Sequence, residues 1–323
     1  TDIPLHRRPK EHSVKDSTKT ENTVLEARGM NRPGSRRTFL RGAAALAAGS
    51  LLGSPAALLR GALPQPGSAM KFGLVTYLWG QDWDLPTLIK NCAASKVLGV
   101  ELRTTHAHKV EPSLSAAERK EVRKRFADSP VTMVGIGSNE RYDNPDPAVV
   151  AKAVEATRAF IKLSHDVGGT GVKVKPDRFH KGVEKEKTIE QIGKSLNQLG
   201  EFAEGWGQEI RLEVHGQCSQ LPTIRKIMDV AQNKNVGVCW NSNAQDLEGK
   251  GLEYNFDLVR KHFGATAHVR ELEDKRYPYE KLMELFVRMD YSGWVMLEAR
   301  GKPKDRVAAL SRQLKLFNSM VAK

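Results

Sequence analysis

Short β-like runs alternate with longer amphipathic stretches from residue 71 to the end of the chain. The β-like runs are rich in Val, Ile, Leu and Gly, as in GVKVK (171–175) and VGVCWN (236–241). Each run is followed by a stretch with the apolar spacing of a helix, and several of these stretches begin near Asp or Pro. This alternation predicts repeated β-then-α units.

Eight such units fit between residue 71 and the end of the chain. The predicted strands cover residues 71–79, 99–104, 131–137, 171–175, 210–215, 236–241, 266–271 and 294–298. The predicted helices cover residues 84–96, 113–127, 147–167, 187–205, 221–233, 256–262, 278–289 and 305–320. Eight units in about 250 residues are typical of an α/β protein with a (β/α)8 TIM barrel. An open doubly wound sheet usually has a glycine-rich phosphate turn after its first strand, and GLVTYLWG is not one.

The first 70 residues lack this alternation. Residues 35–41 read SRRTFLR and precede a run rich in Ala, Leu and Gly. A twin arginine before a modest apolar stretch is typical of export by the twin-arginine route, and this stretch is too short for a stable membrane span. We expect a disordered leader over 1–34, a signal segment and linker over 35–70, and an exported, periplasmic barrel over 71–323. The alternative is a disordered basic tail beside a chance apolar helix.

The net charge of +13 raises the question of nucleic-acid binding. Residues 1–70 carry 11 Lys and Arg against 5 Asp and Glu, whereas the remaining residues carry 40 against 33. The excess on the barrel is spread out, without a basic helix or interleaved aromatic residues, so we expect no nucleic-acid partner. Three widely spaced cysteines without a CxxC pair argue against a disulfide framework or a structural zinc cluster.

Polar residues recur at the carboxyl ends of the last four predicted strands. They are spaced 28, 27 and 30 positions apart, about one unit each, and are Glu213, Asn241, His268 and Glu298. In a TIM barrel these strand ends form the active site. One such residue alone is commonly a solvated loop residue, but four at matching positions indicate a shared site. Two carboxylates, an amide oxygen and an imidazole suit Mn²⁺, Mg²⁺, Co²⁺ or Zn²⁺.

A cation at these strand ends would support chemistry next to a carbonyl group. It would polarise the carbonyl and lower the pKa of the adjacent C–H, and a glutamate could then move the proton. Alternation along an extended chain places His215 on the same face as Glu213, and Arg270 on the same face as His268.

The chain from about residue 71 resembles the xylose isomerase-like TIM barrels of sugar isomerases and epimerases. The resemblance rests on the strand endings LEVHG (212–216), VCWNSN (238–243), HVRE (268–271) and VMLEAR (295–300). It implies four metal ligands, namely Glu213, Asn241, His268 and Glu298. Asn241 stands where the family usually has Asp, which weakens the expected site because an amide is a poorer ligand than a carboxylate.

The resemblance also implies roles for individual side chains in the reaction. Glu213 and Glu298 would act as the acid/base pair at the substrate carbon. Residues implied to hold substrate oxygens are His215, Arg270, Lys175 and His106.

These implied roles describe a metal-dependent isomerase or epimerase of a sugar or related polyhydroxy carbonyl compound. A keto-sugar lyase starts with the same proton abstraction, and a non-catalytic carbohydrate-binding barrel would fit a site weakened at Asn241. The superfamily also contains a DNA-repair branch with three zinc ions, which needs more His and Asp ligands than this chain places at strand ends. The sequence leaves open which sugar is bound and whether the chain forms a homo-oligomer.

Overall fold

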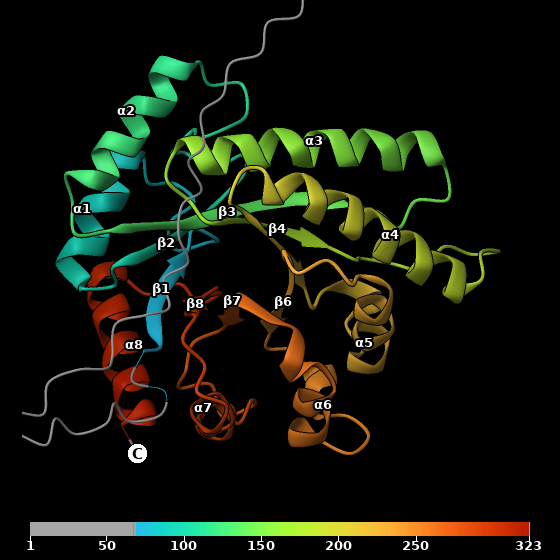
Figure 1. The fold of residues 1–323 in the computed structure, drawn as a ribbon. Coiled ribbons are helices and arrows are strands. Elements are labelled where there is room, and N and C mark those ends of the chain that lie inside the picture. Colours follow the sequence, from blue (N-terminus) through green and yellow to red (C-terminus); the bar gives the residue numbers. More distant parts are fainter. Residues whose placement is uncertain (1–66, 68, 323) are drawn as a thin grey trace, which may run out of the picture. The chain divides into compact units, whose positions relative to one another are not determined.

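The computed structural model describes residue 67 and residues 69–322, and its ribbon shows helices surrounding a barrel of strands (Figure 1). Eight parallel strands pair in chain order, and β8 pairs with β1 to close the barrel. The strands are β1 (Lys71–Val75), β2 (Gly99–Arg103), β3 (Thr132–Arg141), β4 (Gly171–Lys175), β5 (Glu209–Glu213), β6 (Val236–Asn241), β7 (Phe263–Val269) and β8 (Trp294–Leu297). The predicted (β/α)8 TIM barrel is confirmed. The predicted leader and signal segment lie almost entirely outside the described residues.

A helix follows each strand. The helices are α1 (Leu85–Ser95), α2 (Ala116–Ala127), α3 (Pro147–Asp166), α4 (Lys185–Glu204), α5 (Leu221–Val230), α6 (Leu252–Val259), α7 (Tyr279–Arg288) and α8 (Arg306–Val321). Local sequence explains several starts. Asp84 accepts a hydrogen bond from the backbone of Thr87, and Ser115 and Glu118 form a capping box before α2. Within the described part of the chain, no helix has the length and hydrophobicity of a membrane span.

Several strand boundaries differ from the prediction in ways that affect the site. β5 ends at Glu213 and β7 ends at Val269, two residues earlier than predicted in each case. β3 continues to Arg141, four residues beyond its predicted end, and β1 stops at Val75 because the chain turns at Leu78, where φ is 29°. His215 and Arg270 therefore lie beyond their strands.

Apolar side chains form two cores. The larger core lies between the strands and the helices, and the inner cluster consists of Val75, Val134 and Met296 with Tyr77 and Trp294 packed against it. All three cysteines are buried and unpaired.

Glycines on β3 make room for charged side chains inside the barrel. A Cβ atom at Gly135 would lie 2.7 Å from Nη1 of Arg211. A Cβ atom at Gly137 would lie 3.0 Å from Oε1 of Glu101 and 3.1 Å from Cγ of Arg103. Because side chains alternate along a strand, the next residue on this inward face is Asn139.

Candidate active site

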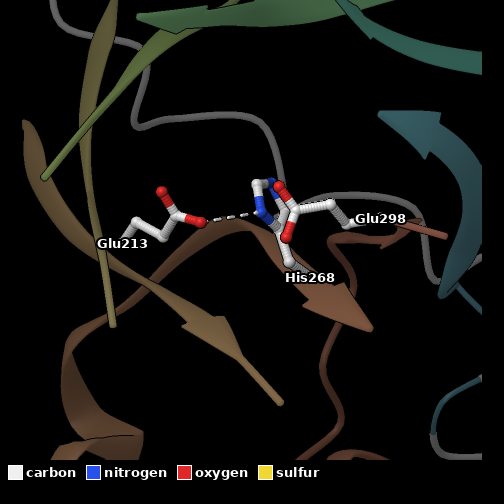
Figure 2. A group of neighbouring side chains, drawn as sticks. All are labelled: Glu213, His268 and Glu298. Carbon is white, nitrogen blue, oxygen red and sulfur yellow. Dashed lines mark ion pairs between the residues drawn. The ribbon is translucent and has the colours of Figure 1, made fainter. Parts of the chain in front are cut away.

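The carboxyl ends of β5, β7 and β8 bring Glu213, His268 and Glu298 together (Figure 2). One ligand atom from each residue lies within 4.8 Å of the others, and all three side chains are buried. Asn241, at the end of β6, lies beside them, and its Nδ2 donates a hydrogen bond of 3.0 Å to Oε1 of Glu213. The four residues predicted from the strand ends therefore share one site.

Two buried polar atoms of this group lack hydrogen-bond partners among the described residues. They are Nδ1 of His268 and Oδ1 of Asn241. The other ring nitrogen of His268, Nε2, lies 3.2 Å from Oε1 of Glu101, which fixes the ring and leaves Nδ1 facing Glu213 at 3.6 Å. A carboxylate behind a histidine is a common arrangement around metal ligands. The donor set fits a divalent cation, because buried polar atoms without partners are otherwise rare.

Lys173 is a part of the site that the strand ends did not reveal. Its Nζ lies 2.7 Å from Oε2 of Glu213, and both side chains are only 1% exposed. Alternation in GVKVK places Lys173 and Lys175 on one face of β4, and this pattern could have identified Lys173 from the sequence. The same reading of GVELR on β2 would have placed Glu101 inside the barrel.

The charges inside the barrel stabilise one another. Burial alone would raise the pKa of Glu213, but Lys173 and His268 hold it well below its usual range. Burial alone would lower the pKa of His268, but Cys239 and Glu101 beside the ring raise it well above its usual range. A cation bound through Nδ1 would have to displace the proton that this environment favours.

The family described as "Xylose isomerase-like TIM barrel" matches residues 89–320. The chain belongs to this family. Solved structures that resemble this xylose isomerase-like barrel include a 3-keto-D-glucoside 4-epimerase from E. coli, with 15% identity and a TM-score of 0.65 over 77% of this chain and 99% of that one. No curated protein matches the chain by sequence.

Two further solved structures have similar likeness. An L-ribulose 3-epimerase has 15% identity and a TM-score of 0.67 over 78% of this chain and 95% of that one. The IolI protein, with a bound zinc atom, has 15% identity and a TM-score of 0.66 over 78% of this chain and 98% of that one. At this identity the likeness shows the shared fold.

Two residues predicted to hold substrate oxygens lie at or just after the ends of β4 and β2. Lys175 ends β4, and its Nζ lies 3.4 Å from Oδ1 of Asn139. Burial, with a contribution from the charge of Lys173, lowers the pKa of Lys175 to about 8. His106 follows β2, and its Nδ1 lies 3.0 Å from Oγ1 of Thr76. Burial and the nearby His108 lower the pKa of His106 to about 4, so its ring is neutral at pH 7.

The other two predicted residues lie beyond the strand ends. Nδ1 of His215 is 2.9 Å from Oδ1 of Asp177, and burial lowers the pKa of His215. Arg270 borders a cavity of about 190 Å³ with Asn243 and Tyr277, and none of the four ligands lines that cavity. Lys175 lies on the same strand face as Lys173, which contacts Glu213.

Proposed function

We propose that this chain is a metal-dependent isomerase or epimerase of a sugar or related polyhydroxy carbonyl compound. The observation that supports this function is the convergence of Glu213, His268 and Glu298 beside Asn241 at the carboxyl end of the barrel. The epimerases of keto-sugars among the similar folds, and the zinc atom in IolI, are consistent with it.

The residues that would hold the cation are Glu213, Asn241, His268 and Glu298. Mn²⁺, Mg²⁺, Co²⁺ and Zn²⁺ all suit this mixed oxygen and nitrogen donor set. When bound, the cation would polarise the substrate carbonyl and offset the negative charge that develops on its oxygen. The neutral amide of Asn241 and the ammonium group of Lys173 both reduce the negative charge available to it.

Glu213 and Glu298 have different roles in the proposed proton transfer. Both oxygens of Glu213 already accept hydrogen bonds, Oε1 from Asn241 and Oε2 from Lys173. No hydrogen bond or ion pair within residues 69–322 holds the carboxylate of Glu298. Glu298 therefore removes the proton from the carbon next to the carbonyl, and Glu213 serves as its partner on the opposite face.

The hydrogen bonds to both oxygens of Glu213 also favour a second candidate function, that of a keto-sugar lyase. A lyase needs one base to remove the proton and then loses a leaving group from the neighbouring carbon. Glu298 alone could perform that first step, so a lyase would not require Glu213 to release Lys173.

Elemental analysis of the full chain first determines its metal content. The test is then to incubate the full chain with keto-sugars in D₂O and to follow proton exchange by NMR. We expect deuterium at the carbon next to the carbonyl, and an epimer or an unsaturated product will distinguish the two reactions. Glu298→Gln should lower exchange by about 10²- to 10⁴-fold, the usual contribution of a general base. The control is Glu201→Gln, on the exposed side of α4. Sugar binding without exchange, unaffected by a chelator, would instead support a binding protein.

We also propose that the barrel is exported by the twin-arginine route. The motif around Arg36 and Arg37 supports this location. A reporter fused after residue 70 should reach the periplasm, and replacement of both arginines by lysine should block its export. A reporter that remains in the cytoplasm with both arginines present would contradict the proposal.

A further inference from the structure

Two cations at the barrel's carboxyl end share one neutral oxygen. Arg103 on β2 and Lys175 on β4 flank β3, and both donate to Oδ1 of Asn139, at 2.9 Å from Nη2 of Arg103 and 3.4 Å from Nζ of Lys175. No carboxylate of the described residues lies within the 4.0 Å of an ion pair from either of them. The other cations nearby differ, because Lys173 is paired with Glu213 and Arg141 with Asp177.

The local sequence holds Arg103 in this position. Gly137 leaves space for its side chain, since a Cβ atom there would lie 3.1 Å from Cγ of Arg103. The ring of Tyr77 lies under the guanidinium group at 5.0 Å, and Oγ1 of Thr76 accepts a hydrogen bond from the backbone N of Arg103. Nε of Arg103 is buried and has no hydrogen-bond partner in the described part of the chain.

Two cations without an ion-pair partner are unfavourable without an anion. Lys175 is only 7% exposed, and the charges of Lys173 and Arg103 disfavour its own charge, whereas Glu213 and Asp177 favour it without forming an ion pair with it. Burying charges without partners costs free energy, whereas a carboxylate or phosphate would accept charge-assisted hydrogen bonds from both groups. The planar guanidinium group of Arg103, with a free buried N–H, is suited to such oxyanions.

The pair also has a fixed relation to the candidate metal ligands. Lys175 follows Lys173 by one strand repeat, about 6.6 Å along the strand, and Lys173 contacts Glu213. A molecule that reacts near Glu213 and Glu298 can therefore place its other end between Arg103 and Lys175.

We propose that Arg103, Lys175 and Asn139 form a subsite for an oxyanion, so that the substrate is an acidic sugar carrying a carboxylate or phosphate group. That the oxyanion belongs to the substrate rests on the proposed function. The anion binding itself does not.

The test compares the binding of three probes to the full chain by calorimetry: D-glucose, D-gluconate and D-glucose 6-phosphate. At least one acidic probe should bind about 10- to 100-fold more tightly than D-glucose, as expected for hydrogen bonds to a charged group. The acidic probe that binds more tightly shows whether the subsite prefers a carboxylate or a phosphate. Equal affinity for all three probes, or no binding of either acid, would overturn the subsite.

Two variants test the residues. Arg103→Gln should remove about tenfold or more of the affinity for the acid and change the affinity for D-glucose by much less. Asn139→Asp is nearly isosteric and places a carboxylate between the two cations, so it should abolish the preference for acids while keeping or raising the melting temperature. Arg141→Gln is the control, because Asp177 already pairs with Arg141. If both test variants bind the acid as the wild type does, the assignment is wrong.

The deuterium-exchange assay separates this inference from the proposed function. Exchange of neutral and acidic keto-sugars at equal efficiency would leave the reaction standing and overturn the subsite. A preference for acidic probes that Arg103→Gln abolishes, without exchange of any sugar, would leave the subsite standing and overturn the reaction.

Discussion

Strands β5–β8 and strands β2–β4 line two sides of the same opening, and the side chains on the two sides differ in charge. The first group provides Glu213, Asn241, His268 and Glu298, which are donors for a cation. The second group contributes Glu101, which contacts His268, and the cations Arg103 and Lys175, which form no ion pair with a carboxylate among the described residues. The side with the candidate metal ligands thus adjoins a side whose cations would attract an anion.

This difference gives the site a direction. A substrate with a carbonyl group at one end and an acidic group at the other would bind in a single orientation. Lys173 links the two sides, because it belongs to β4 and pairs with Glu213 of β5. Changes on one side should therefore be measurable on the other.

The largest effect is expected from breaking the ion pair between Lys173 and Glu213. Glu213→Gln leaves the ammonium group of Lys173 buried without its ion pair, which should lower the free energy of unfolding by about 3–5 kcal/mol. Urea titration in the presence of a chelator measures this loss. The double variant with Lys173→Met should recover most of it, because the buried charge is removed. A loss below about 1 kcal/mol, or no recovery, would show that the two sides are independent.

A substitution at Asn241 should destabilise the metal-free protein but tighten the binding of metal. In metal-free protein, Asn241→Asp removes the hydrogen bond to Glu213 and adds a like charge, which should cost about 1–3 kcal/mol. With metal present, the added carboxylate should tighten binding on the order of tenfold. Melting temperatures and competition with a coloured chelator test both signs. Destabilisation in both states would argue that Asn241 does not approach the cation.

The basic side should respond to pH through Lys175. Its charged form is disfavoured by burial, Lys173 and Arg103 and favoured by Glu213 and Asp177, and the resulting pKa is about 8. Lys175 is therefore charged below about pH 8 and loses its charge above it, so affinity for the acidic probe should fall by about tenfold between pH 7 and pH 9.5. Calorimetry at several pH values measures this. Lys175→Arg should remove the decline, and an equal decline in that variant would contradict the assignment.

The smallest effect is expected at His215. Its partner Asp177 is shared with Arg141, and the His215 side chain is 37% exposed. His215→Gln should change the free energy of unfolding by less than about 1 kcal/mol, because it removes one partly exposed hydrogen bond to Asp177. Urea titration of wild type and variant tests this, and a loss of more than about 2 kcal/mol would place His215 in the buried charge network.

The sequence predicted the fold and the convergence of four candidate ligands, because both depend on a local repeat. β4 and β6 have the predicted bounds, and polar residues at successive strand ends converge wherever such strands close into a barrel. His215 and Arg270 lie beyond the ends of their strands, so strand periodicity alone does not determine where their side chains lie.

The basic side could not be predicted in the same way. Asn139, which accepts hydrogen bonds from both Arg103 and Lys175, belongs to β3 only because that strand continues to Arg141, past the predicted end at residue 137. The pairing of Lys173 with Glu213 joins different strands, and no periodicity within one strand specifies it.

The arginine beneath the candidate site has a kinetic consequence. Arg211 is buried inside the barrel, where its Nε lies 2.7 Å from Oε2 of Glu209, and Gly135 and Gly171 leave the space that it fills. Because Arg211 fills the interior at this level, the reactant and product of the proposed reaction would both pass through the opening at the carboxyl ends of the strands. Accumulated product would then compete with reactant for that opening and slow the reaction.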